Sequence, residues 1–282
     1  MKKKWIRILP ALILLGVVVW TVWGNTALEI TEYEIVSDRI PQGFSGFRIA
    51  QISDLHNTEF GEGNCRLVDL LSQTEPNIIV ITGDLIDSRH TDMEIALAFA
   101  RQAVAIAPVY YVSGNHEARI GEYGNLKKRL TDAGVVVLEN QMVLLTRGGD
   151  SITLLGIDDP SFRPGAEASV SALALAELQI GSDSYNVLLA HRPELFSVYA
   201  DSGIDLVFSG HAHGGQFRLP FFGGLVAPNQ GLFPRYDAGM FASDSTTMIV
   251  SRGIGNSIIP LRFNNRPEVI VATLECGYAA GG

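Results

Sequence analysis

Five of the six histidines lie in short polar runs that follow stretches typical of strands, and one further run is rich in aspartate. The runs are Ser53-Asp54-Leu55-His56, Gly83-Asp84-Leu85-Ile86-Asp87, Gly114-Asn115-His116-Glu117, Ala190-His191-Arg192 and Gly210-His211-Ala212-His213. Strand ends are the places where an α/β scaffold holds polar side chains rigidly and brings them to one crevice. The sequence therefore predicts one built site, from which His90 stands apart.

The donors in these runs form a metal-ligand set without a thiolate. The expected ligands are Asp54, His56, Asp84, Asn115, His191, His211 and His213. Carboxylate, amide and imidazole donors suit Mn²⁺, Fe or Zn²⁺ and argue against Cu(I) or an iron–sulfur cluster. The set exceeds what one tetrahedral ion needs, but it suffices for two ions that share a bridging carboxylate. The i, i+2 spacing within Asp54-Leu55-His56 and within His211-Ala212-His213 can direct both donors of each pair to one side of an extended segment.

The elements that must position these side chains are strands separated by helices. After Ile40, short β-branched runs alternate with amphipathic stretches, which favours an α/β domain. Strands are expected at residues 47–52, 78–81, 109–112, 135–138, 152–157, 187–190, 206–208, 248–250 and 269–274. Helical spacing joins Leu67, Leu70 and Leu71, then Ile95, Phe99 and Ala103, then Leu126, Leu130 and Ala133. Residues 45–282 are expected to form one catalytic domain after a lead-in at 26–44, and residues 214–239 to form a long loop.

Residues 1–25 are expected to be a membrane anchor or a signal segment. Residues 5–23 carry one charge, Arg7, and are about long enough to cross a bilayer. Lys2, Lys3 and Lys4 precede this stretch, and the positive-inside rule keeps them in the cytoplasm. A single-pass protein of the cytoplasmic membrane with its domain on the extracytoplasmic side is expected. Cleavage near Gly24 or Ala27 is the alternative, and it also exports the domain.

The composition excludes several classes of protein. A chain of 282 residues with 47% hydrophobic residues can bury an ample core. The net charge is −9, and 17 basic against 30 acidic residues remain once Lys2, Lys3, Lys4 and Arg7 are set aside, which argues against nucleic acid binding. Two cysteines, Cys65 and Cys276, rule out a disulfide scaffold and a four-cysteine zinc site. Whether the two pair, and which oligomer forms, stay open.

The five polar runs, in this order, resemble the calcineurin-like metallophosphoesterase family. The family pattern of Asp-x-His, Gly-Asp-x-x-Asp, Gly-Asn-His-Asp/Glu, His and Gly-His-x-His is met at all five places within residues 47–213. Residues 210–239, Ser251-Arg252-Gly253 and Asn265-Arg266-Pro267-Glu268 resemble a subgroup of membrane-anchored or exported bacterial phosphohydrolases. The resemblance implies a four-layer α/β/β/α sandwich of two mixed sheets flanked by helices.

The resemblance also implies which residues hold each ion. The first metal would bind Asp54, His56 and His213. The second metal would bind Asn115, His191 and His211. Asp84 would bridge the two. Two ions about 3.5–4 Å apart can lower the pKa of a shared water and clamp the attacking and leaving oxygens during displacement at phosphorus.

Other positions are expected to act on the substrate. By the resemblance, His116 would protonate the leaving oxygen or stabilise the phosphoryl charge, which suits an imidazole that titrates near neutral pH. Asn115 would donate to phosphoryl oxygens, and Asp87 would orient a ligand or its loop. The candidates for binding a second phosphate or a head group are Arg192, Arg119 and Arg252.

The expected function is hydrolysis of a phosphodiester or pyrophosphate, on a phospholipid or nucleotide-lipid where the substrate is lipid-linked, outside the cytoplasmic membrane. A phosphomonoesterase of the same family stays open, as does a cell-surface binding module with a structural metal site. Four phenylalanines either form an apolar wall for a lipid-like substrate or pack the long loop. They are Phe217, Phe221, Phe222 and Phe233.

Overall fold

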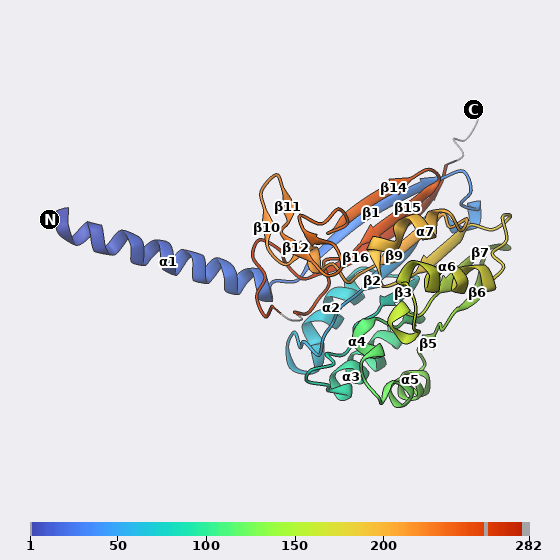
Figure 1. Ribbon diagram of the computed structural model, residues 1–282, viewed down its shortest axis with the longest axis horizontal. Helices are drawn as coiled ribbons and strands as arrows, with labels where there is room; N and C mark the ends of the chain where they lie inside the picture. The colour runs from blue at the N-terminus through green and yellow to red at the C-terminus, as the bar shows by residue number, and fades with distance from the viewer. Residues whose placement is uncertain (1, 257–258, 278–282) are drawn as a thin grey trace.

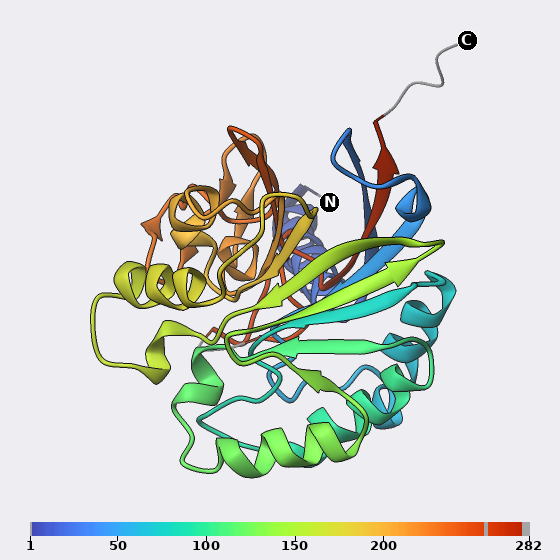
Figure 2. The ribbon, with the colours of Figure 1, turned by 90° about the vertical axis from the view of Figure 1, so that its right-hand side faces the viewer.

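Two six-stranded mixed sheets lie face to face, with helices on the outer face of each (Figure 1, Figure 2). The computed structural model describes residues 2–256 and 259–277, with side chains from residue 9 onward. Cys65 and Cys276 are both free thiols.

The first sheet carries the strands of the N-terminal half together with the last strand. Its order is β1 (Glu29–Ser37), β16 (Glu268–Cys276), β2 (Phe47–Ile52), β3 (Ile78–Thr82), β4 (Val109–Val112) and β5 (Val136–Val137). Strands β2 to β5 run parallel, β16 is antiparallel to β2, and β1 is parallel to β16. The helices on its outer face are α2 (Cys65–Gln73), α3 (Met93–Val104) and α5 (Tyr123–Asp132).

The second sheet is built from the C-terminal half. Its order is β14 (Gly239–Ser243), β15 (Thr246–Val250), β9 (Leu206–Ser209), β8 (Asn186–Leu189), β7 (Asp150–Gly156) and β6 (Gln141–Arg147). Strands β15, β9, β8 and β7 are parallel, and the two edge strands are antiparallel to their neighbours. The helices α6 (Glu167–Glu177) and α7 (Phe196–Ala200) cover its outer face.

The central strands are buried on both faces, which explains why they are continuous apolar runs. Ile49, Val80 and Ile270 of the first sheet pack in one cluster with Leu189 and Phe208 of the second. Separate clusters join each sheet to its own helices. The expected four-layer α/β/β/α sandwich is confirmed.

Several elements were not expected from the sequence. Strand β1 lies within residues 26–44, the expected lead-in, and pairs with β16 along its whole length. The expected long loop contains two short hairpins, β10 (Arg218–Leu219) with β11 (Gly223–Gly224) and β12 (Val226–Ala227) with β13 (Gly231–Leu232). Strands β6 and β14 and helix α6 were also not predicted from the sequence. Most of these strands lie at sheet edges or form short pairs, where one face meets solvent and the apolar signal is weak.

The chain begins with α1 (Lys2–Thr26), which projects away from the sandwich (Figure 1). Its residues 9–26 have a mean hydropathy of 1.6, are only 6% buried, and are long and apolar enough to cross a membrane by length and composition. The side chains of Lys2, Lys3, Lys4 and Arg7, on which the expected orientation depends, lie outside the described residues. The remaining short helices are α4 (Asn115–Ala118), η1 (Gln42–Phe44), η2 (Glu62–Asn64), η3 (Pro160–Phe162), η4 (Pro193–Leu195) and η5 (His213–Gly215).

Candidate metal centre

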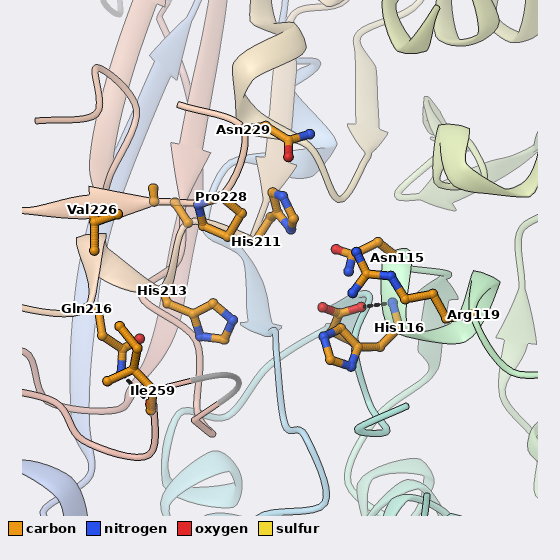
Figure 3. A pocket seen from close by; sticks show the side chains of 13 residues that line it. Asn115, His116, Arg119, His211, His213, Gln216, Val226, Pro228, Asn229 and Ile259 are labelled. Carbon is orange, nitrogen blue, oxygen red and sulfur yellow. Dashed lines mark hydrogen bonds between the residues drawn. The ribbon is translucent and has the colours of Figure 1, made fainter. Parts of the chain in front are cut away.

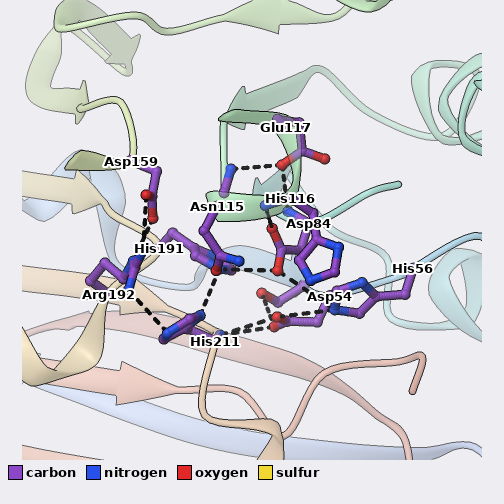
Figure 4. A network of polar contacts seen from close by, with 12 residues as sticks. Asp54, His56, Asp84, Asn115, His116, Glu117, Asp159, His191, Arg192 and His211 are labelled. Atoms are coloured by element: carbon purple, nitrogen blue, oxygen red, sulfur yellow. Dashed lines mark hydrogen bonds and ion pairs between the residues drawn. The ribbon is translucent and has the colours of Figure 1, made fainter. Parts of the chain in front are cut away.

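All five polar runs lie at the carboxyl ends of parallel strands, where the two sheets meet (Figure 4). The runs follow β2, β3 and β4 in the first sheet and β8 and β9 in the second. The seven expected ligands are all buried. The sandwich therefore brings together donors that are far apart in the chain.

The first group of donors is Asp54, His56 and His213, whose ligand atoms lie within 4.8 Å of one another. The two Nε2 atoms of His56 and His213 are 3.2 Å apart, and Asp54 Oδ1 lies 3.5 Å from His213 Nε2. Burial lowers the pKa of both histidines to about 3, so both rings are neutral. Two neutral rings can share only one hydrogen bond here, whereas a cation between them would use both lone pairs.

The second group contains Asp84, His191 and His211. His191 Nε2 lies 3.3 Å from Asp84 Oδ2 and 3.1 Å from His211 Nδ1. His191 Nδ1 lies 2.7 Å from the Thr82 carbonyl, which only accepts, so Nδ1 carries the proton and Nε2 faces the site. Burial lowers the pKa of His191, but Asp84 outweighs this and raises it to about 10. A metal ion would therefore compete with a proton for Nε2.

Asn115 completes the second group in an orientation that fits a cation. Its Oδ1 lies 2.8 Å from His211 Nδ1 and 3.2 Å from His191 Nε2, while its Nδ2 lies 3.1 Å from an Arg119 nitrogen. The amide rotated by 180° would instead donate to the two imidazoles and accept from Arg119. The chemistry of the buried donor set, which is carboxylate, imidazole and amide oxygen, fits a metal ion.

Asp84 lies between the two groups. Its Oδ2 is 3.6 Å from His56 Nε2 and 3.3 Å from His191 Nε2, and its Oδ1 accepts a hydrogen bond of 2.8 Å from the His116 backbone. This is the place that a bridging carboxylate must occupy between two ions. The neighbouring Gly83 has φ of 90°, a conformation open to glycine and strained for other residues.

Glu117 holds the loop that carries Asp84, a part that the sequence did not predict for it. Its Oε2 accepts hydrogen bonds from the backbone N–H groups of Asp84 (2.8 Å) and Gly114 (2.7 Å), and its Oε1 from that of Ile86 (3.2 Å). Burial and the charge of Asp84 raise the pKa of Glu117 to about 7. The available signal was its place as the last residue of Gly-Asn-His-Glu.

Asp54 is held on the other side of the site. Ser53 Oγ donates to its Oδ2 at 2.6 Å, and the His211 backbone N–H donates at 3.0 Å. A Cβ atom at Gly210 would lie 1.9 Å from Ser53 Oγ, so only glycine allows the two strand ends this close approach. The i, i+2 pairs thus reach one centre through backbone contacts between the sheets.

His116 presents a defined tautomer to the site. Its Nδ1 accepts a hydrogen bond of 3.0 Å from the Ser88 backbone N–H, so the proton of the neutral ring is on Nε2. Burial lowers the pKa of His116, against the opposing charges of Asp84 and Asp87. Asp87 Oδ1 is 3.6 Å from Nδ1, and Asp87 also binds Arg89, so this loop acid borders the histidine.

A cavity of about 270 Å³ opens over these groups (Figure 3). Asn115, His116 and Arg119 lie on one side of it, and His211 and His213 face them from the other. Its apolar lining comes from Val226, Ala227, Pro228 and Ile259. None of the four phenylalanines of the expected wall is among the described residues that line it.

The three expected substrate-binding arginines have different environments. Arg119 lines the cavity. Arg192 is buried, binds Asp159 through two contacts of 2.6 and 3.1 Å, and places Nη1 3.2 Å from His211 Nε2. Arg252 binds Glu29 and lies 2.6 Å from Glu268. The structure thus gives Arg192 and Arg252 carboxylate partners outside the cavity, because Asp159 and Glu268 are buried beside them.

Comparisons with known proteins agree with this geometry. The family model for calcineurin-like phosphoesterases matches residues 47–215. The chain is 33% identical over 256 residues to the uncharacterized metallophosphoesterase YkuE of Bacillus subtilis, covering 88% of this chain and 86% of that protein. It is 29% identical over 243 residues to the phosphodiesterase YaeI of Escherichia coli, covering 81% and 82%.

A solved structure shares the fold. The crystal structure of TT1561 from Thermus thermophilus aligns with a TM-score of 0.52 at 16% identity, over 74% of this chain and 90% of that chain. The family match spans more than half of the chain and includes every expected metal ligand. The protein therefore belongs to the calcineurin-like phosphoesterase family and is a metal-dependent phosphoesterase.

Proposed function

We propose that the protein hydrolyses a phosphodiester or a pyrophosphate at a site for two metal ions, on the extracytoplasmic side of a membrane. The observation that carries the proposal is the position of Asp84 Oδ2, within 3.6 Å of His56 Nε2 and 3.3 Å of His191 Nε2. One ion would bind Asp54, His56 and His213, the other Asn115, His191 and His211, and Asp84 would bind both. Two such ions, Mn, Fe or Zn, would supply a water of lowered pKa and positive charge for the phosphoryl oxygens.

The protein residues have separate parts in the reaction. The oxygen of water bonds to phosphorus, the bond from phosphorus to the leaving oxygen breaks, and the leaving oxygen takes a proton. His116 Nε2–H would donate a hydrogen bond to a phosphoryl oxygen or to the leaving oxygen and so stabilise its charge, since Ser88 keeps Nδ1 as an acceptor and the ring neutral. The leaving oxygen would then take its proton from solvent water. Arg119, in the cavity, would bind a phosphoryl oxygen.

A diester suits the cavity better than a monoester. A diester phosphate carries one negative charge and a second ester group, whereas a monoester dianion needs additional cations. Of the three candidate arginines, Arg192 and Arg252 are engaged by carboxylates. Val226, Pro228 and Ile259 leave room for a second, apolar ester group. The name of the relative YaeI, a phosphodiesterase, supports the same preference.

The proposed location rests on α1. Its residues 9–26 are long and apolar enough to cross a membrane, and three lysines precede them in the sequence. The positive-inside rule then favours a cytoplasmic N-terminus and an exported domain.

The test is a panel of substrates with metal analysis. Full-length protein purified without chelator is expected to hold two metal ions and, with Mn²⁺, to hydrolyse bis-p-nitrophenyl phosphate in preference to p-nitrophenyl phosphate. Hydrolysis of the monoester alone would refute the diester preference. Absence of hydrolysis in fully metal-loaded protein would refute the proposed reaction.

The variant His116→Ala tests this hydrogen-bond donor. Its kcat is expected to fall by roughly 10² to 10³-fold, the usual effect of removing one donor to a developing oxyanion, while metal content stays the same. His90→Ala, which alters the one histidine outside the polar runs, is the matched control and should leave kcat unchanged. Equal kcat in wild type and His116→Ala would exclude this role.

A further inference from the structure

Helix α1 meets the sandwich with no flexible linker. It ends at Thr26, and β1 begins at Glu29. Asn25 Nδ2 donates to the Arg262 carbonyl at 2.9 Å, and the Arg262 N–H donates to Asn25 Oδ1 at 2.8 Å. The Arg266 guanidinium lies 4.7 Å from the centre of the Trp23 ring. Since tryptophan prefers the bilayer interface, these contacts place residues 262–266 at the level of the membrane surface.

The short hairpins lie beside the same helix end. The Arg218 N–H donates to the Phe263 carbonyl at 3.0 Å, which ties β10 to the segment that binds Asn25. Figure 1 shows β10, β11 and β12 next to the end of α1, on the side of the sandwich from which the helix projects. A membrane crossed by α1 would therefore face these hairpins.

Large apolar side chains stand exposed on the two hairpins, Phe221 and Phe222 in the turn between β10 and β11, and Leu232 and Phe233 at the end of β13; we call these four residues the hairpin tips. Their exposed fractions are 104%, 74%, 70% and 60% in that order. Phe221 and Phe233 also adopt φ of 71° and 53°, a region that bulky residues rarely occupy. Exposed aromatic side chains on a strained backbone indicate a surface that is covered by an apolar environment when the protein functions.

The second hairpin, β12 with β13, forms part of the apolar side of the cavity. Val226 and Ala227 of β12 line it, and Val226 pairs with Leu232 of the tips. Gln216 Nε2 donates to the carbonyl of Ile259, another lining residue, at 2.9 Å. Leu232 is therefore separated from the cavity by one pair of short strands.

We propose that the hairpin tips insert into the outer leaflet beside α1, so that the cavity receives a phosphodiester or pyrophosphate carried by a membrane lipid. The substrate part rests on the proposed function, while insertion of the tips does not. The lipid chains would stay in the bilayer, and the phosphate would reach His116 and Arg119 past Val226 and Ile259. Hydrolysis would release one product as a phosphate monoester.

Insertion is tested by fluorescence in vesicles. Full-length protein with Cys65→Ser and Cys276→Ser receives one new thiol by Phe222→Cys, labelled with an environment-sensitive fluorophore. Leu144→Cys is the matched control, since Leu144 is 62% exposed and lies on β6, on the far side of the sandwich from α1. In vesicles of phosphatidylcholine and phosphatidylglycerol, lipids spin-labelled near the head group should quench position 222 about threefold more than position 144.

Equal quenching at the two positions would overturn insertion. Protection of position 222 that depends on protein concentration in detergent, with no lipid quenching, would identify a second copy as the occupant and would also overturn it.

The substrate class has a separate readout. The double variant Phe221→Ser/Phe222→Ser is expected to lower, by about tenfold, the ratio of hydrolysis of vesicle phosphatidylglycerol to that of bis-p-nitrophenyl phosphate. Leu144→Ser should leave this ratio unchanged. An unchanged ratio in the double variant would refute a lipid-borne substrate. Failure of wild type to hydrolyse either ester would instead refute the proposed function, and the quenching result would still decide insertion.

Discussion

The two halves of the metal centre differ in how the protein supports their ligands. In the half made by His191, His211 and Asn115, the Thr82 carbonyl accepts a hydrogen bond from His191 Nδ1, which directs Nε2 of that ring toward the site. In the half made by Asp54, His56 and His213, only Asp54 is held in this way, and Nδ1 of each histidine is buried without a hydrogen-bond partner among the described residues. The half with His191, which we call the supported half, is preorganised by protein contacts. The half with His56 and His213 depends more on the ion that it would hold.

The variant Asp84→Ala should abolish the difference in metal binding between the two halves, because it removes the carboxylate that both share. We expect activity to fall by roughly 10³-fold or more, because neither ion keeps its bridging ligand. Metal content measured by mass spectrometry should drop below one ion per chain. Asp92→Ala, which alters the exposed capping residue of α3, is the control. Two retained ions would contradict a bridging role.

His213→Ala should separate the halves. We expect one ion to remain in the supported half, while activity falls by roughly 10²-fold because two ions act together. Titration with a weak chelator should likewise remove one ion from the wild type before the other. Simultaneous loss of both ions in these experiments would show that the halves do not differ.

Glu117→Gln tests the contact that fixes Asp84. The glutamine keeps the size but introduces an N–H₂ group against backbone donors, so we expect a loss of about 2–3 kcal/mol in the free energy of unfolding of the metal-free protein. Denaturant unfolding followed by circular dichroism measures it. Glu122→Gln provides an exposed control. A change below about 0.5 kcal/mol, as usual for surface sites, would rule out this part for Glu117.

Arg192→Met should give the smallest effect. Arg192 is held by Asp159 and packs beside His211, which indicates a positioning residue, so metal affinity of the supported half should weaken by about tenfold, with KM for the diester unchanged. Metal titration and steady-state kinetics with saturating Mn²⁺ give the two values. A raised KM with unaltered metal affinity would indicate that Arg192 binds the substrate, as the sequence predicted.

Much of the fold was predictable because its central strands are apolar on both faces. Strands β2 and β4 occur at the expected residues, and the other expected strands differ by a few residues at their ends. Strand β1 was not predicted because its charged residues obscure the alternation of apolar and polar side chains. Its partner β16 also lies more than two hundred residues away in the sequence. The outer elements depend on contacts that no local pattern records.

The candidate site divides in the same way. The donor types and the i, i+2 spacing of His211 and His213 were sufficient to predict a metal-binding set, since few other functions use so many imidazoles and carboxylates at strand ends. The part of Glu117 was not predictable, because an acid beside a motif is solvated as often as it is buried. The different environments of Arg119, Arg192 and Arg252 likewise depend on partners that only folding brings close to them.

By itself, the sequence determined the chemistry: which donors exist, which strands carry them, and that an apolar helix precedes them. These are local properties of side chains and their spacing. Only the tertiary structure decided that Asp84 stands between two groups of donors, that Arg192 binds Asp159 beside His211, and that the hairpin tips lie beside α1. Each depends on distances between residues remote in the chain, and packing of two sheets sets those distances.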